Sequence, residues 1–286
     1  MEMDHTAILL IDCPDRKGVV ATIADFLYRH GANVLHADQH QDNDQKLFFM
    51  RVEWDLADFD IDAEAFKREF LPIAAKFEMN WRLEYGKTRP AVAIFVSRHL
   101  HCLVDLLYRY QIGEFQCVIP LIISNHTDAK PLADFYGVPF HHVPVTAANK
   151  AEAERRQVEL LEANNVSLTV LARYMQVLSS DFVARHPRKI INVHHSFLPA
   201  FSGAKPYHAA FERGVKLIGA TSHYVTDVLD EGPIIEQDVI RVSHRDNARD
   251  LIHKGRDVER TVLSRAVQWH LQHRILCYGN KTVVFD

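Results

Sequence analysis

The sequence predicts an α/β protein of two domains, and three observations lead to that fold class. The chain has 286 residues, which is long for one ordinary domain and suggests about two. Its first part shows a βαββαβ order of strands and amphipathic helices. Beyond a polar, turn-rich stretch, single strands and helices alternate, which is typical of an open, mostly parallel sheet with helices on both faces. We therefore predict domains at residues 1–85 and 91–286, joined by a linker at residues 86–90.

The elements of the first domain follow from apolar spacing and turn residues. An apolar strand at Thr6–Asp12 leads into a turn at Cys13–Gly18. The next helix keeps its apolar residues on one stripe, and Gly31 marks its end. The remaining elements are predicted as a strand at Asn33–Gln41, a turn at Asp42–Gln45, a strand at Leu47–Trp54, a helix at Asp62–Lys76 and a strand at Glu78–Glu84.

The second domain begins with β-rich runs that are separated by helical stretches. The strands are predicted at Ala91–Val96, Cys117–Ser124, His141–Pro144, Ser167–Leu171 and Lys189–Val193. The helices are predicted at His101–Tyr110, Pro131–Tyr136, Lys150–Asn164 and Leu178–His186. They are followed by apolar runs at Leu217–Val225 and Gly232–Arg241, a long helix at Ala248–Gln272 and a last strand at Thr282–Phe285.

Composition argues against several classes of function. The net charge is −4 and no cluster of lysine and arginine occurs, so we expect no nucleic-acid partner. No signal peptide is evident, and no apolar run approaches the roughly 20 residues that span a bilayer, so we expect no membrane association. The four cysteines are scattered without a Cys-x-x-Cys pair, which indicates a reducing, cytoplasmic setting. The 18 histidines include no His-x-x-x-His helix face with a nearby acidic residue, so we expect no metal.

The stretch Lys189–Asp230 holds a constellation that could act on a carbonyl group. Side chains alternate along a strand, so Asn192 and His194 share one face at the end of an apolar run. A later loop carries two carboxylates, Asp227 and Asp230. An amide and a protonated imidazole can stabilise an oxyanion, while a carboxylate orients the imidazole and handles a water molecule.

The motifs around these residues resemble those of the folate-dependent formyltransferase family, from about Arg89 to the C-terminus. They are Asn192-x-His194, the turn Ser196-x-Leu198-Pro199 and the run Leu229–Pro233. The resemblance implies a Rossmann-like formyltransferase domain in which Asn192, His194 and Asp230 hold the catalytic roles.

Two neighbouring residues compete for those roles. The family places its carboxylate directly before the Gly-Pro pair, which favours Asp230, and Asp227 is expected to brace the loop through local hydrogen bonds. His195 would face away from His194 in a regular strand, and its plain interpretation is a buried, hydrogen-bonded structural histidine. Whether His195 also helps to order the attacking water molecule is left open by the sequence.

The run Leu171–Leu178 follows a predicted strand, at the edge where open α/β sheets place their ligands. Taken alone, these residues are hydrophobes that enter a helix. The resemblance makes them walls of a folate pocket, with 10-formyltetrahydrofolate as the substrate and no further cofactor. The residues expected to line the pocket are Tyr174, Met175, Val177, Leu178, Val225 and Asp227.

The loop Ser97–Leu103 helps to decide whether the expected reaction is hydrolysis or formyl transfer. Family members that formylate glycinamide ribonucleotide hold its phosphate on a glycine-rich loop, but Ser97–Leu103 contains no glycine here. The runs His194–Phe201 and Gly203–His208 resemble the hydrolytic branch of the family. The expected reaction is hydrolysis of 10-formyltetrahydrofolate to formate and tetrahydrofolate, which supplies formate for purine synthesis and balances the one-carbon pool. The alternatives are formyl transfer to an amine acceptor and a non-catalytic folate or amino-acid sensor.

The first domain, with its Pro-Asp-Arg-Lys-Gly loop, resembles the ACT regulatory domain. The resemblance implies a small-molecule site near Asp15, Arg16, Gly18 and Asn33, an amino-acid effector such as glycine or methionine, and a homo-oligomer. The plainer interpretation is that Gly18 permits a tight turn and Asp15 caps a helix.

Overall fold

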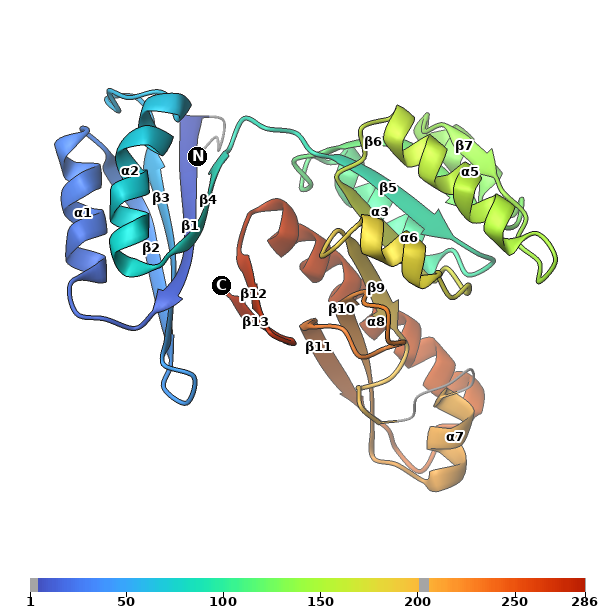
Figure 1. The fold of residues 1–286 in the computed structure, drawn as a ribbon. Helices are drawn as coiled ribbons and strands as arrows, with labels where there is room; N and C mark the ends of the chain where they lie inside the picture. The colour runs from blue at the N-terminus through green and yellow to red at the C-terminus, as the bar shows by residue number, and fades with distance from the viewer. Residues whose placement is uncertain (1–4, 201–205, 286) are drawn as a thin grey trace. The chain divides into compact units, whose positions relative to one another are not determined.

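A computed structural model describes residues 5–200 and 206–285 (Figure 1). The chain forms two compact units. The first comprises the residues up to Thr88 together with 272–278 and the segment from Val283, and the second comprises 89–271 with 279–282. Across the described ranges, no helix is long and apolar enough to cross a membrane.

The first unit contains a four-stranded antiparallel sheet with two helices on one face (Figure 1). Its strand order is β2-β3-β1-β4, so the predicted βαββαβ arrangement is confirmed. Every second residue of β1, beginning with Ala7, faces the helices and contacts residues such as Phe66 and Phe70. The elements are β1 (Thr6–Pro14), α1 (Val19–Arg29), β2 (Asn33–Asp42), β3 (Leu47–Asp55), α2 (Ala63–Phe77) and β4 (Asn80–Tyr85).

The opposite face of this sheet is covered by the C-terminal segment. Ile8 and Leu10 form a second apolar cluster with residues that include Leu276 and Phe285. Arg51 donates to the carbonyl oxygens of Gln272 and His273, and Arg82 donates to that of Ile275. The sequence pattern predicts that the whole of 91–286 belongs to the second domain. The structure differs because β1 is apolar on both faces, and the second face must also be buried.

His273 makes the stability of the first unit depend on pH. Burial, together with the positive charges of Arg82 and Arg51, lowers the pKa of His273 to about 4. The unfolded chain therefore binds a proton between about pH 6.5 and pH 4 that the folded chain excludes. We expect the free energy of unfolding to be unaffected by His273 above that window and to fall by about 3 kcal/mol as the pH drops through it.

Denaturant unfolding at pH 7 and at pH 4 measures this effect. The variant His273→Gln should lose about 3 kcal/mol of the pH dependence, whereas His36→Gln, at an exposed position on β2, should retain it. Equal pH dependence in the wild type and His273→Gln would show that His273 is not the group that titrates.

The second unit contains a seven-stranded sheet of order β11-β10-β9-β8-β5-β6-β7. The five neighbouring strands β9, β8, β5, β6 and β7 are parallel to one another. β10 pairs antiparallel with both β9 and β11. The predicted mostly parallel sheet is confirmed. The strands are β5 (Ala91–Val96), β6 (Val118–Ser124), β7 (Phe140–His142), β8 (Leu168–Ala172), β9 (Ile190–His194), β10 (Leu217–Tyr224) and β11 (Ile234–Arg241). The helices are α3 (His101–Gln111), α4 (Lys130–Tyr136), α5 (Lys150–Ala163), α6 (Ser180–Arg185), α7 (Pro206–Arg213) and α8 (Ala248–Leu271).

Two short elements were not predicted from the sequence. They are α7 and the strand β12 (Ile275–Tyr278), which pairs with β13 (Lys281–Val284). Neither shows an apolar pattern clear enough to identify it.

The site is positioned where the parallel part of the sheet meets the antiparallel part. β9 runs parallel to β8 on one side and antiparallel to β10 on the other. In the β9–β10 register, Asn192 lies opposite His223 and His194 lies opposite Thr221. Side chains directly opposite each other in an antiparallel pair point to the same face, so β10 adds its own polar residues to those of β9.

Candidate active site

A cavity of about 290 Å³ lies at the carboxyl ends of β8 and β9 and beside the loop that follows β10. Asn192, His194 and Asp230 all line it, so the structure brings the three predicted catalytic residues together. The same cavity is lined by every residue predicted for the folate pocket: Tyr174, Met175, Val177, Leu178, Val225 and Asp227.

His194, which is buried, and Asp230, which is partly buried, form a pair. His194 Nδ1 lies 3.2 Å from Asp230 Oδ2, and the two side chains are 6% and 16% exposed. Because a carboxylate only accepts, Nδ1 of His194 is the donor in this contact. The other ring nitrogen, Nε2, is buried and has no hydrogen-bond partner within the described part of the chain. It is therefore the nitrogen that can meet a substrate.

Asp230 stays ionised at neutral pH. Burial by itself would raise the pKa of Asp230, but the hydrogen bond and charge of His194, with smaller contributions from His223 and His195, bring this pKa below its ordinary value. A carboxylate that keeps its charge can hold His194 in one orientation and can accept a proton from water.

The loop that carries Asp230 is tightly constrained. Asp230 has φ 58°, a left-handed conformation that aspartate tolerates better than most residues. A Cβ on Gly232 would lie 1.7 Å from the carbonyl oxygen of Tyr224, so only glycine fits there. The predicted brace by Asp227 is wrong: its exposed side chain makes no hydrogen bond among residues 5–200 and 206–285, and Thr226 Oγ1 instead donates to the carbonyl of Val228.

His223 is a site residue to which the sequence analysis assigned no role. Its Nδ1 donates to the carbonyl oxygen of Tyr224 at 3.0 Å, so Nε2 of the neutral ring can accept. Nε2 lies 3.2 Å from Asn192 Nδ2 and 3.8 Å from Asp230 Oδ1. Burial is the main cause that lowers the pKa of His223, which favours the neutral ring. His223 thus fixes the orientation of the Asn192 amide. This contact depends on the antiparallel register of β9 and β10, which the sequence did not predict.

His195 follows the end of β9 and is 7% exposed, and its part in structure or in ordering water stays a prediction. Its ring centre lies 5.2 Å from that of His194 and 6.0 Å from that of Tyr207. His195 lines the cavity described above and also a second, mainly apolar cavity of about 360 Å³. Part of the motif predicted nearby, residues 201–205, lies outside the described residues.

The glycine-free loop Ser97–Leu103, which follows β5, contacts the loop that lines the cavity. Ser97 Oγ donates to Asn125 Oδ1 at 2.6 Å and accepts from the backbone N–H of Met175 at 3.0 Å. Met175 lies in the loop that lines the cavity. The side chain of Ser97 therefore holds this loop in place.

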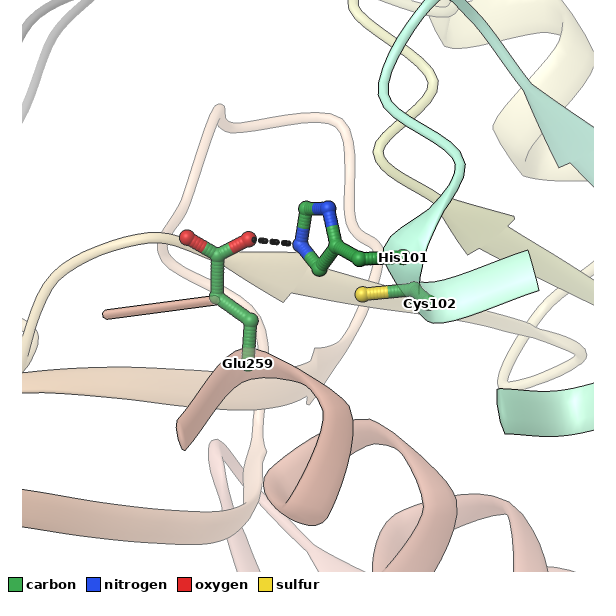
Figure 2. Close-up of side chains that lie close together, drawn as sticks. All are labelled: His101, Cys102 and Glu259. Carbon is green, nitrogen blue, oxygen red and sulfur yellow. Dashed lines mark hydrogen bonds and ion pairs between the residues drawn. The ribbon is translucent and has the colours of Figure 1, made fainter. Parts of the chain in front are cut away.

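A second buried polar cluster is centred on Glu259 of α8, which is 1% exposed. His101 Nε2 lies 2.7 Å from one carboxylate oxygen, and Tyr207 donates to the other at 2.6 Å (Figure 2 shows the His101 contact). Arg173 Nε lies 3.4 Å from the oxygen that His101 contacts. Burial would raise the pKa of Glu259, but the hydrogen bond from His101 and the charge of Arg173 lower it below its ordinary value.

Cys102 completes a group whose ligand atoms lie within 4.8 Å of one another, a spacing that could suit a metal (Figure 2). Burial raises the pKa of the Cys102 thiol well above its ordinary value, which disfavours the thiolate that metals bind. The Glu259 carboxylate already has hydrogen-bond contacts with His101 and Tyr207 and an ion pair with Arg173. The contacts define a hydrogen-bond network.

In the first unit, the predicted effector residues lie in the β1–α1 turn and at the start of β2. Gly18 has φ 92° and precedes α1, which accounts for its use in the turn. Asp15 accepts from Gln41, Arg16 pairs with Glu78, and Asn33 is exposed. Asp15 does not cap α1, because the helix has no side-chain cap.

This geometry agrees with comparisons to known proteins. Residues 91–267 match the model of the formyl transferase family, and residues 7–70 match the ACT domain. The chain belongs to the formyl transferase family, and its first unit is an ACT domain.

Similarity to two formyltetrahydrofolate deformylases runs along nearly the whole chain. The chain is 54% identical over 280 residues to that of Synechocystis sp., covering 98% of each chain. It is 50% identical to that of Bacillus subtilis, covering 97% of this chain and 93% of the relative.

Among solved structures, a deformylase matches the whole chain, whereas a transformylase matches about two thirds of it. A formyltetrahydrofolate deformylase from Pseudomonas syringae pv. tomato superimposes with a TM-score of 0.96 and 46% identity, over 99% of this chain and 95% of that one. Glycinamide ribonucleotide transformylase 1 from Symbiobacterium toebii matches with a TM-score of 0.65 and 29% identity, over 69% of this chain and 95% of that one.

Proposed function

We propose that this chain is a hydrolase that converts 10-formyltetrahydrofolate and water into formate and tetrahydrofolate. One observation carries the proposal: the three polar groups suited to formyl chemistry line one cavity in a chain that resembles deformylases from end to end. The transformylase structure accounts for only 69% of the chain. The roles of Asn192, His194 and Asp230 belong to this proposal.

The chemistry follows from the contacts. Asp230 accepts a proton from water as its oxygen adds to the formyl carbon. When both ring nitrogens of His194 carry protons, Nδ1 donates to Asp230 and Nε2 donates to the oxyanion. The Asn192 amide, held through one N–H by His223, offers its second N–H to the same oxygen. The C–N bond then breaks, the folate nitrogen takes a proton and formate leaves.

Water is favoured over an amine as the nucleophile. The loop at Ser97–Leu103 lacks glycine, and Ser97 is committed to Asn125 and Met175. Bulky side chains at a helix N-terminus obstruct the close backbone approach that a phosphate needs. The pocket residues Tyr174, Met175, Val177, Leu178, Val225 and Asp227 would hold the folate ring.

The remaining parts of the proposal concern ligands and partners. The enzyme needs no metal and no cofactor besides its folate substrate. The ACT domain would bind an amino-acid effector, glycine or methionine, through Asp15, Arg16, Gly18 and Asn33. Its edge strand β2 offers backbone groups for pairing in a homo-oligomer. In the cytoplasm, formate release would balance the one-carbon pool and feed purine synthesis.

Formate release from 10-formyltetrahydrofolate tests the proposal. The purified protein is incubated with this substrate alone and with glycinamide ribonucleotide added. Formate and tetrahydrofolate should form in equal amounts and at equal rates in both reactions. Turnover only with the nucleotide would establish a transferase, and folate binding without turnover in either reaction would establish a sensor.

A further inference from the structure

Arg173 is a buried arginine at the active-site cavity. It follows β8 directly, it is 9% exposed, and it lines the same cavity as Asn192, His194 and Asp230. Its backbone has φ 62°, a left-handed conformation that an arginine seldom adopts. Strained backbone held in this way is concentrated at ligand sites.

The guanidinium of Arg173 is incompletely paired. Its Nε lies 3.4 Å from Glu259 Oε2 in an ion pair, and both Nε and Nη1 are buried without a hydrogen-bond partner among the described residues. Buried charges are stable only when paired and hydrogen-bonded, and an unsatisfied buried donor calls for a water molecule or a ligand. Glu259 cannot pair with the remaining N–H groups of Arg173, because its carboxylate already contacts His101 and Tyr207.

We propose that Arg173 forms a subsite for formate, the small carboxylate that leaves the reaction. This inference rests on the proposed function, because hydrolysis is what produces formate in the cavity. The substrate carries a neutral formyl amide. After water adds and the C–N bond breaks, the formyl carbon becomes a carboxylate with a full negative charge. A guanidinium is the side chain best matched to that group in geometry and charge.

Glu259 is the positioning residue of this subsite. Its ion pair with Nε holds the guanidinium, while His101 and Tyr207 hold the carboxylate of Glu259 from two other elements. The negative charge of Glu259 also limits how strongly Arg173 attracts an anion. Formate can therefore bind and still leave, which repeated turnover requires.

Formate binding to the protein without folate measures the subsite directly. ¹³C-labelled formate is titrated by NMR at constant ionic strength, with chloride and acetate as comparison anions. Saturable binding of formate, stronger than that of acetate and absent for chloride, is expected. Equal effects of formate and chloride, or no saturation by formate, would overturn the proposal.

Variants assign the binding to Arg173. Arg173→Met should weaken formate binding by about tenfold to a hundredfold, as loss of a charge-assisted hydrogen bond does. Arg173→Lys should retain part of the affinity because it keeps the charge. The matched control Arg156→Met removes an exposed arginine on α5 and should bind formate as the wild type does. Equal affinity in Arg173→Met and the wild type would reject the assignment.

Glu259→Gln separates binding from a merely structural role. The amide oxygen can still accept from the guanidinium and keep it in place, but the negative charge that limits anion binding is gone, so formate affinity should rise. A loss as large as that of Arg173→Met would mean that the cluster only maintains the fold. The titration does not depend on turnover. Arg173-dependent formate binding in a protein that hydrolyses no folate would reject the proposed function and leave the subsite standing.

Discussion

Replacement of Asp230 by asparagine is expected to lower kcat of the proposed hydrolysis by about three powers of ten. The change keeps the size of the side chain but removes its charge. Asparagine can still accept from His194 Nδ1, yet it cannot stabilise an imidazolium or take a proton from water. Both functions depend on the ionised form, which the low pKa of Asp230 maintains at neutral pH.

Steady-state formate release measures this loss, with folate binding followed by fluorescence. Glu231→Gln removes the adjacent exposed carboxylate and should keep normal turnover. Folate affinity of Asp230→Asn should change much less than kcat. If the variant kept a tenth or more of wild-type turnover, Asp230 would not belong to the catalytic set.

Replacement of Asn192 by alanine is expected to reduce kcat by about two to three powers of ten, the usual loss for one oxyanion donor. The amide is fixed by His223 and lies in the cavity with His194, so its free N–H is pre-oriented. Alanine removes the donor and leaves His223 Nε2 without its partner. KM should change little, because the interaction strengthens only as the oxyanion forms.

Asn192→Asp serves as a companion of the same size, since its carboxylate cannot donate and should lose activity to a similar or greater degree. Asn43→Ala, which removes an exposed amide, is the matched control. Thermal unfolding separates lost catalysis from lost folding. An effect seen in KM alone would place Asn192 in substrate binding and not in catalysis.

Local patterns were sufficient for much of the fold and for part of the site. Strand periodicity places Asn192 and His194 on one face, and both line the cavity. The position of Asp230 came from the motif before Gly232, and the left-handed φ of Asp230 and the close approach of Gly232 to Tyr224 show the loop geometry behind that motif. The helix α7 was missed because its residues show no clear apolar stripe in the sequence.

The sequence by itself determined most of the strand and helix order, the shared face of Asn192 and His194, and the missing glycines at Ser97–Leu103. These features depend on neighbours along the chain, where periodicity and turn chemistry act. Only the tertiary structure decided that His223 lies opposite Asn192 and that Glu259 pairs with Arg173. It also decided that the C-terminal segment covers the first sheet. Strand register and packing between distant segments arise from burial of complementary surfaces, and no local pattern encodes which surfaces meet.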